Sequence, residues 1–230
     1  TSVSRGLGDV YKRQPYMYYI KFSDFFIVGS SPETLVKVEK NKVTIKPIAG
    51  TRLKEKGKEE EIKEDLLSDP KELAEHLMLL DLGRNDVGRV SKVGSINVKE
   101  SFQIQETSHL YHIYSTVEGD LNPEEDRVSA LCAGFPAGTV TGAPKIRAME
   151  IINEIEDRKR GIYSGAIGYF SSSGDMDTAI ALRTAVIKDN KMYVQAGGGV
   201  VYDSDEEYEF NETLNKAQAL FSAAKEVLTK

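Results

Sequence analysis

The stretch that decides the fold reads Gln195-Ala196-Gly197-Gly198-Gly199-Val200-Val201-Tyr202-Asp203-Ser204, followed by Glu209-Phe210-Asn211-Glu212-Thr213-Leu214-Asn215-Lys216-Ala217. This pattern predicts a strand that runs into three glycines, turns and enters a helix. Successive glycines let the backbone approach a ligand closely and offer N–H groups to an anion. Glu209 and Glu212 share a helix face and suit a hard cation such as Mg²⁺. A glycine turn before an acidic, solvated helix start fits the same residues, so both interpretations stay open.

Composition limits the class of protein. The chain has 230 residues, 40% of them hydrophobic, which is enough for a sizeable core. A net charge of −6 disfavours nucleic acid and anionic membranes as partners. The single cysteine, Cys132, excludes an internal disulfide and is typical of a reducing compartment, so we expect a cytoplasmic protein. No apolar run approaches the roughly 20 residues of a membrane span.

The first residues do not match the rest of the chain. The run Ser4-Arg5-Gly6-Leu7-Gly8-Asp9-Val10-Tyr11-Lys12-Arg13-Gln14 matches the translation of a transposase adaptor used in DNA sequencing libraries. We therefore interpret residues 1–14 as non-native and expect a catalytic domain over residues 15–230, incomplete at its N-terminus. A genuine basic N-terminal segment is the alternative.

Alternating residues after position 15 predict strands at 16–22, 25–29, 34–39 and 42–46, arranged as an antiparallel meander. The meander is interrupted by Ser31-Pro32-Glu33, where a glutamate is usually solvated, and it is closed by Pro47-Ile48-Ala49-Gly50-Thr51-Arg52. Further strands are expected at 93–98, 102–106, 162–171, 179–188 and 191–195.

Helices are expected at 122–132, at 145–156 and from Asp69 to about residue 86. Asp69 is the predicted N-cap of the last of these, with Pro70 in its first turn and Glu72 completing a capping box. Paired glutamates three residues apart occur at several places in the chain, so their spacing alone identifies no metal site. These pairs are Glu61/Glu64, Glu72/Glu75, Glu206/Glu209 and Glu209/Glu212.

Three other features suggest chemistry only weakly. His109 and His112 lie three residues apart, but without a further ligand motif they make a poor zinc candidate. The turn at 135–145 ends in Lys145 at a helix start, and its glycine, threonine and lysine are able to bind an anion. Arg183 lies inside an apolar strand, where it needs a carboxylate partner.

Four motifs together resemble the chorismate-utilising enzyme family, and within it the anthranilate synthase branch. They lie at 47–52, 75–86, 135–145 and 197–217, and the resemblance extends over residues 15–230. It implies an α+β fold of two packed antiparallel β-sheets flanked by helices, with the active site between them and with the N-terminal part missing.

The same resemblance implies roles for individual residues. It makes Glu75 and Glu212 the Mg²⁺ ligands, with Glu72 and Glu209 one turn earlier holding metal-bound water. It gives Glu33, His112 and Thr139 catalytic roles. The remaining positions are substrate contacts at Gly50, Thr51, Tyr163, Arg183, Gly197, Gly198, Gly199 and Lys216, and part of a tryptophan inhibitor site at Pro15, Tyr16 and Met17.

The reaction implied by the resemblance is the Mg²⁺-dependent conversion of chorismate and ammonia to anthranilate and pyruvate, in tryptophan biosynthesis. A glutamine amidotransferase subunit would supply the ammonia, and L-tryptophan would act as feedback inhibitor. Glu33 matches the acid that protonates the departing hydroxyl, and His112 matches the histidine linked to pyruvate elimination. Glu33 must then be protonated when the substrate binds.

Two alternatives remain. Aminodeoxychorismate synthases of the folate pathway typically have a nucleophilic lysine at the position of Ala49, and alanine forms no covalent adduct. The anthranilate branch is therefore favoured over that one. The second alternative is an inactive truncated fragment, because missing strands leave unpaired sheet edges.

Overall fold

The structure, a computed structural model, describes residues 16–107 and 110–228. The segment interpreted as an adaptor, Pro15 of the expected inhibitor site and His109 all lie outside the described residues.

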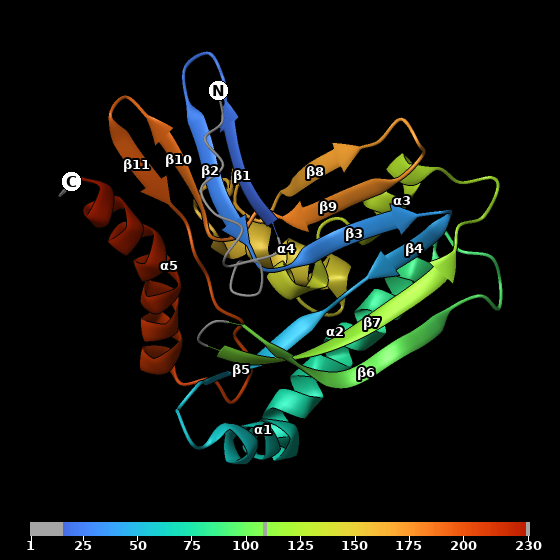
Figure 1. Cartoon of the computed structure of the whole chain (residues 1–230), viewed down its shortest axis with the longest axis horizontal. Helices are drawn as coiled ribbons and strands as arrows, with labels where there is room; N and C mark the ends of the chain where they lie inside the picture. The colour runs from blue at the N-terminus through green and yellow to red at the C-terminus, as the bar shows by residue number, and fades with distance from the viewer. Residues whose placement is uncertain (1–15, 108–109, 229–230) are drawn as a thin grey trace.

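Two antiparallel sheets form the framework (Figure 1). The smaller, here sheet A, has the strand order β1 (Tyr16–Lys21), β2 (Phe26–Ser31), β10 (Thr184–Lys188) and β11 (Lys191–Val194). The larger, sheet B, has the order β5 (Ile48–Leu53), β7 (Leu110–Asp120), β4 (Lys42–Ile45), β3 (Thr34–Glu39), β9 (Met176–Ile180) and β8 (Ala166–Phe170), with β6 (Asn97–Glu106) on the other side of β7. The expected α+β fold of two antiparallel sheets is confirmed.

The chain crosses between the sheets at two neighbouring places. The first crossing follows β2 at Ser31, and the second lies between β9 and β10, where Arg183 has a positive φ of 47°. The Ile180 N–H donates to the Glu33 carbonyl at 3.1 Å, and the Ser30 N–H donates to the Arg183 carbonyl at 3.1 Å. These bonds hold the two crossings side by side. We call this region the joint.

The joint corrects two predictions. The four strands of the expected meander divide between the sheets, two in each, and the expected strand 179–188 is two strands in different sheets. Conversely, the strands expected at 93–98 and 102–106 form the single strand β6. Alternation along a segment reports which face is buried, but it does not report which sheet a strand joins.

The helices cover sheet B and flank sheet A (Figure 1). α2 (Pro70–Gly88) packs on β4, β5 and β7, while α1 (Glu59–Ser68) packs on β5 and β7 and α3 (Arg127–Gly134) on β3. The predicted cap is confirmed, because the Asp69 carboxylate accepts from the N–H groups of Lys71 and Glu72. The remaining helices are α4 (Lys145–Ile155) and α5 (Glu206–Leu228), and a short 3-10 turn, η1, spans Gly138–Val140.

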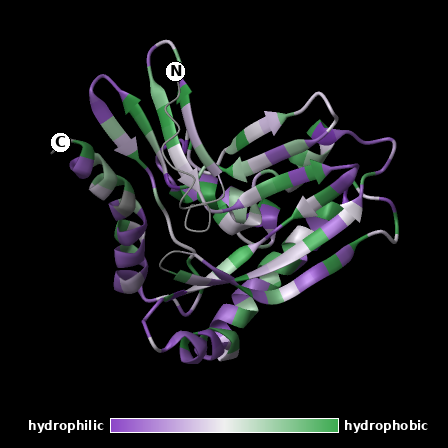
Figure 2. Cartoon of the chain, in the orientation of Figure 1, coloured by the Kyte–Doolittle hydropathy of each residue, from purple (hydrophilic) through white to green (hydrophobic). Residues whose placement is uncertain are grey.

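The main core lies between sheet B and the helices α2 and α3. It contains Val36 and Val38 of β3, Val87 of α2 and Met176 of β9, all with no exposed surface. Figure 2 shows hydrophobic residues along the strands of sheet B, alternating with hydrophilic ones. Within residues 16–107 and 110–228, no helix is both long and apolar enough to cross a membrane.

Candidate active site

Glu33 lies buried at the joint, directly after the chain leaves sheet A. Only 7% of its surface is exposed, which corrects the expectation that a glutamate in this turn is solvated. Its N–H donates to the Ser31 hydroxyl at 3.3 Å, and its carbonyl accepts from Ile180 of β9. The backbone is therefore fixed from both sides, and the carboxyl group is held inside the protein.

Burial dominates the electrostatics of this carboxyl group. Loss of hydration raises the pKa of Glu33 to about 8, although the Thr139 hydroxyl and the Ile48 N–H both act to lower it. Thr139 Oγ1 is itself buried and makes no hydrogen bond of good geometry, so its influence on Glu33 is that of a nearby dipole. Glu33 and Thr139 line a cavity of about 30 Å³. A carboxyl group of this kind is protonated at neutral pH and able to donate a proton.

His112 of β7 faces the same region from sheet B. Its Nδ1 lies 3.2 Å from the Gly50 carbonyl oxygen and 3.1 Å from Thr51 Oγ1. A carbonyl oxygen only accepts hydrogen bonds, so Nδ1 carries the proton and Nε2 is left as a base. Burial lowers the pKa of His112, and the charge of Arg183 lowers it further. His112 is thus a neutral imidazole close to a guanidinium group.

Arg183 carries an unpaired charge at the joint. No carboxylate or hydrogen-bond acceptor among the described residues meets its guanidinium group, so the carboxylate partner that this arginine needs is not supplied by that part of the chain. Burial lowers the pKa of Arg183, as expected for a desolvated cation. An anionic ligand would supply the interactions that the half-buried guanidinium lacks among the described residues.

The glycine run passes close to functional side chains in the loop that leads to α5. A Cβ atom on Gly197 would lie 3.0 Å from the Tyr163 hydroxyl oxygen, and one on Gly198 would lie 3.2 Å from Glu212 Oε2 and 3.4 Å from Glu209 Oε2. Side chains at these two positions would displace those groups. The glycines therefore allow these side chains to lie close to the loop backbone, while the predicted approach to a ligand stays a prediction.

Glutamates from α2 and α5 converge on this glycine run. A Cβ atom on Gly199 would lie 4.0 Å from Glu75 Oε1, which places Glu75 beside the loop that also contacts Glu212. Burial raises the pKa of Glu75, and the negative charges of Glu72 and Glu212 raise it further. Two helices from distant parts of the chain thus bring like charges together.

A divalent cation fits this arrangement chemically. Carboxylate oxygens are the ligands that Mg²⁺ prefers, and Mg²⁺ commonly uses one or two carboxylates and keeps several waters. No group of three or more His, Cys, Asp or Glu side chains in the described ranges is arranged to hold a metal ion. The arrangement therefore suits a cation bound by Glu75 and Glu212 with water and substrate, and it does not suit a closed protein cage.

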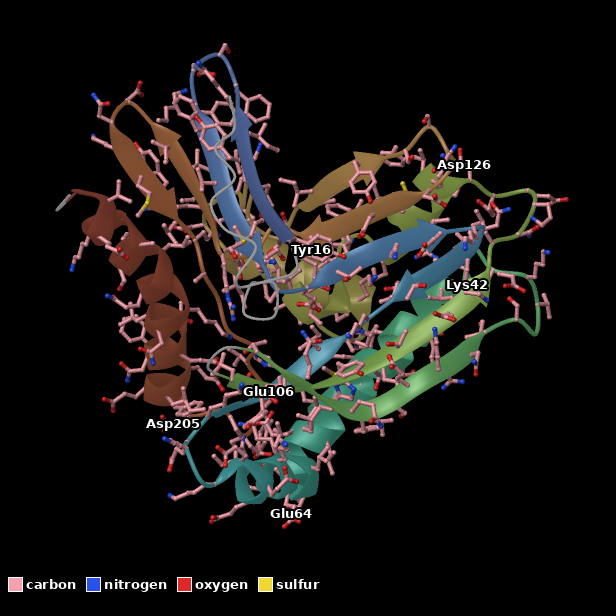
Figure 3. All side chains as sticks on the ribbon, in the orientation of Figure 1. Tyr16, Lys42, Glu64, Glu106, Asp126 and Asp205 are labelled. Atoms are coloured by element: carbon pink, nitrogen blue, oxygen red, sulfur yellow. The ribbon has the colours of Figure 1, made fainter. Side chains whose placement is uncertain are left out.

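Lys216 completes this end of the site. Its Nζ lies 3.2 Å from Glu212 Oε2 and donates to the Gly197 carbonyl at 3.4 Å. On the other side, the Ser204 hydroxyl donates to Glu209 Oε1 at 2.9 Å. Asp205, labelled at the start of α5 in Figure 3, accepts from the N–H of Tyr208 and so caps the helix. The cap fixes the first turn, which carries Glu209, and Glu212 follows one turn later.

Arg52 of β5 is a site residue that sequence reasoning missed. Its guanidinium contacts Asp65 at 2.7 Å, Asp69 at 2.6 Å and Glu72 at 3.0 Å, and 27% of the side chain is exposed. Glu72 therefore turns toward Arg52 in place of closing the expected capping box. Next to it, Gly50 has a φ of +70°, and a Cβ atom there would lie 3.1 Å from Glu72 Oε2. The signals in the sequence were the place of Arg52 at the end of the motif 47–52 and the acidic segment that follows it.

Replacing Arg52 with methionine is expected to lower the unfolding free energy by about 1–3 kcal/mol, because three carboxylates lose their shared counter-charge. For a chain of this size, that corresponds to a fall in Tm of about 2–12 °C. Arg147→Met is a matched control, since this exposed arginine contacts Glu150 and Glu154 at the surface and contributes little. Differential scanning calorimetry measures both, and equal Tm values for the two variants would contradict the assigned role of Arg52.

The structure also corrects the role suggested for Lys145. Its ammonium group forms an ion pair with Asp86 at 2.7 Å and is only 11% exposed, so it is not free to bind an anion. His112, from the weak zinc candidate, instead contacts Gly50 and Thr51. At the expected inhibitor site, the Tyr16 hydroxyl (Figure 3) donates to Asp177, while Met17 is 60% exposed.

Known proteins resemble this chain in sequence. Residues 9–222 match the family described as "chorismate binding enzyme". Anthranilate synthase component 1 of Cereibacter sphaeroides is 58% identical over 214 residues, which cover 92% of this chain and 43% of that protein. The chain thus spans less than half the length of this relative.

Solved structures share the fold. Anthranilate synthase component I from Streptococcus pneumoniae TIGR4 superposes with a TM-score of 0.84 and is 49% identical, covering 90% of this chain and 46% of that one. A putative 2,3-dihydroxybenzoate-specific isochorismate synthase from Bacillus anthracis superposes with a TM-score of 0.79 at 28% identity, covering 90% and 56%. The two antiparallel sheets are therefore a framework common to these proteins.

Proposed function

Because the chain belongs to the chorismate binding enzyme family, we propose that it is the catalytic part of an anthranilate synthase aminating subunit, a lyase of tryptophan biosynthesis. It would convert chorismate and ammonia to anthranilate and pyruvate. The observation that carries this proposal is a buried acid, Glu33, on one crossing of the joint and a cation, Arg183, on the other, with a neutral base, His112, whose pKa the charge of Arg183 lowers. The reaction needs a group of each kind.

Binding of the substrate would use the charges that the protein leaves unpaired. Chorismate carries two carboxylates, one on the ring and one on the enolpyruvyl side chain. Arg183 and Tyr163 would bind the enolpyruvyl carboxylate, because the Arg183 guanidinium lacks a protein acceptor among the described residues. The ring carboxylate would lie against the backbone N–H groups of residues 197–199, with Glu75 and Glu212 behind them. Gly50, Thr51 and Lys216 would complete the pocket.

Proton transfer would divide between two groups, Glu33 and His112. Ammonia adds at C2 of the ring and the C4 hydroxyl leaves as water, taking the proton of Glu33. Loss of the C2 proton and of the enolpyruvyl group as pyruvate would then form the aromatic ring. His112 Nε2 would take the C2 proton, and the enolpyruvyl group would be protonated as it leaves as pyruvate. Bound Mg²⁺ supplies charge neutralisation at the ring carboxylate. Glu72 and Glu209 would hold its water ligands.

The partner and the location follow from the same proposal. Ammonia would come from a glutamine amidotransferase subunit, L-tryptophan would inhibit through a site that includes Tyr16 and Met17, and the protein would be cytoplasmic. The folate-pathway alternative is less favoured because Ala49 of β5 is an aliphatic residue, 8% exposed and paired with Ile113 of β7. It offers no nucleophile to the ring.

The experiment supplies the chain with chorismate, ammonium and Mg²⁺ and follows anthranilate fluorescence, with pyruvate measured separately. We expect equal amounts of the two products, and no product when Mg²⁺ is chelated. Formation of aminodeoxychorismate without pyruvate would refute the argument from Ala49. A chain that unfolds cooperatively but turns over no chorismate would support the non-catalytic fragment.

A further inference from the structure

The Asp86–Lys145 pair connects three helices at the base of the turn that carries Thr139. Asp86 belongs to the last turn of α2, and Lys145 is the first residue of α4. Their charged atoms lie 2.7 Å apart, with the side chains 9% and 11% exposed respectively. Lys145 Nζ also lies 3.5 Å from the carbonyl oxygen of Gly134, the last residue of α3. One ammonium group therefore closes the loop of residues 135–144 and fastens it to α2.

The loop itself packs tightly against α2. A Cβ atom on Gly138 would lie 2.7 Å from Leu82 Cδ1, which leaves no space between the loop and the helix. On its other side, Arg160 donates to the Val140 carbonyl at 2.6 Å. Thr139 lies between these two attachments, in η1. Its position is therefore set by its anchors, since its hydroxyl makes no hydrogen bond of good geometry.

The same cavity joins the pair to Glu33. Glu33, Thr139 and Asp86 all line the space of about 30 Å³, together with Gly134 and Lys46. The charged groups that line this cavity with Glu33 are Lys46 from the β4–β5 connection and Asp86 from α2, with Lys145 of α4 behind Asp86, while Arg183 lies on the neighbouring crossing of the joint. Because Asp86 and Lys145 neutralise each other, the pair acts on Glu33 mainly through the loop that it holds.

We propose that Asp86 and Lys145 are positioning residues that hold the 135–144 loop so that the Thr139 hydroxyl faces the Glu33 carboxyl group. This inference rests on the proposed function for the catalytic role of Glu33. The placement of the Thr139 hydroxyl toward the Glu33 carboxyl group does not depend on that role. The buried pair costs desolvation energy, and replacing such pairs by apolar residues is often neutral for stability. A role in positioning the loop would explain the presence of the Asp86–Lys145 pair, which stability alone does not.

The test is a mutant cycle built on Thr139. The variants are Thr139→Val, the neutralised pair Asp86→Asn/Lys145→Met, and the triple variant. The Thr139 hydroxyl favours the ionised form of Glu33, so its loss or displacement raises the pKa of that group. We expect both Thr139→Val and the neutralised pair to move the alkaline limb of kcat to higher pH by about 0.5–1 unit. In the triple variant, we expect no shift beyond that of Thr139→Val.

Two further variants and a second measurement keep this test decisive. Lys145→Arg keeps the ion pair and should leave the alkaline limb of kcat at its original pH. Lys42→Met removes the exposed Lys42–Asp120 pair and serves as the control. If the neutralised pair does not fold, Gly138→Ala displaces the same loop against Leu82 and should move the limb in the same direction. The pH dependence of thermal unfolding reports the proton affinity of Glu33 without any turnover, so it decides the inference even if no anthranilate forms. Additive shifts, or a neutralised pair that leaves both pH profiles unchanged, would overturn the proposal.

Discussion

Replacing Glu212 with glutamine is expected to reduce Mg²⁺-dependent anthranilate formation by about 100-fold or more, while leaving the fold intact. Glutamine keeps the shape of the side chain but removes the charge that a hard cation needs. The substitution also relieves repulsion, because the negative charge of Glu212 raises the pKa of Glu75. The ion pair of Glu212 with Lys216 is exposed on both sides, so its loss changes the unfolding free energy by less than about 1 kcal/mol.

The measurement is anthranilate fluorescence as a function of Mg²⁺ concentration, with the Tm of the same samples. Glu207→Gln is the matched control, since Glu207 is an exposed residue in the first turn of the same helix. It removes an equal charge and should leave the Mg²⁺ dependence unchanged. A Glu212→Gln variant with wild-type Mg²⁺ dependence would show that α5 does not supply a metal ligand. If the Mg²⁺-dependent activity fell only when Glu75→Gln was added to Glu212→Gln, α2 would be the principal source of the metal ligands.

Local sequence signals were sufficient for most single elements. The Asp69 cap, the strand at 34–39, the strand expected at 42–46 and observed to end at Ile45, and the polar turn between those strands were all predicted from residue type and spacing. In that turn, Lys40 and Asn41 have φ values of 51° and 59°, a conformation that asparagine tolerates well. Each of these features depends on interactions within a few residues, and for that reason the sequence reports them.

The joint was not predictable in this way. Ser31 and Arg183 end or interrupt strands without a glycine, and an arginine with positive φ has no local motif. The bonds from Ile180 to Glu33 and from Arg183 to Ser30 connect residues more than 140 positions apart. Burial of Glu33 results from these long-range contacts. A local reading of Ser31-Pro32-Glu33 therefore gives a solvated turn.

The glutamate cluster shows the same limit. Pairs three residues apart recur along the chain, and no local property distinguishes Glu75 or Glu212 from Glu61 or Glu64. Their convergence depends on how α2 and α5 lie around the loop of residues 197–199. The family resemblance identified these residues because the motifs of the family already reflect how the two helices pack. Arg52, Asp86 and Lys145 lie inside the family motifs, but their ion-pair partners were identified only by the structure.

Replacing Glu33 with glutamine is expected to reduce anthranilate formation by about 10²- to 10⁴-fold, the usual contribution of a general acid. Glutamine is nearly isosteric and neutral, like the protonated acid, but it donates no proton to the departing hydroxyl. In the unmodified chain, kcat should fall as pH rises through about 8, where Glu33 ionises. The residual activity of Glu33→Gln should lack this alkaline limb. If the residual activity of Glu33→Gln still falls at high pH, a group other than Glu33 is responsible for the alkaline limb.

The same variant has a second, opposite effect that does not depend on catalysis. The pKa of Glu33 is raised in the folded state above its usual value of 4.5, so the folded state binds this proton more tightly than the unfolded state does. Stability therefore falls as pH rises from about 4.5 to about 8, by an amount on the order of a few kcal/mol, and then levels off. Glu33→Gln removes this loss, so its advantage in Tm over the unmodified chain should be larger at pH 9 than at pH 6. Asp24→Asn, a change at an exposed carboxylate in the turn between β1 and β2, is the control. An equal Tm difference at the two pH values would mean that Glu33 ionises normally, and the buried acid would then lose its place in the mechanism.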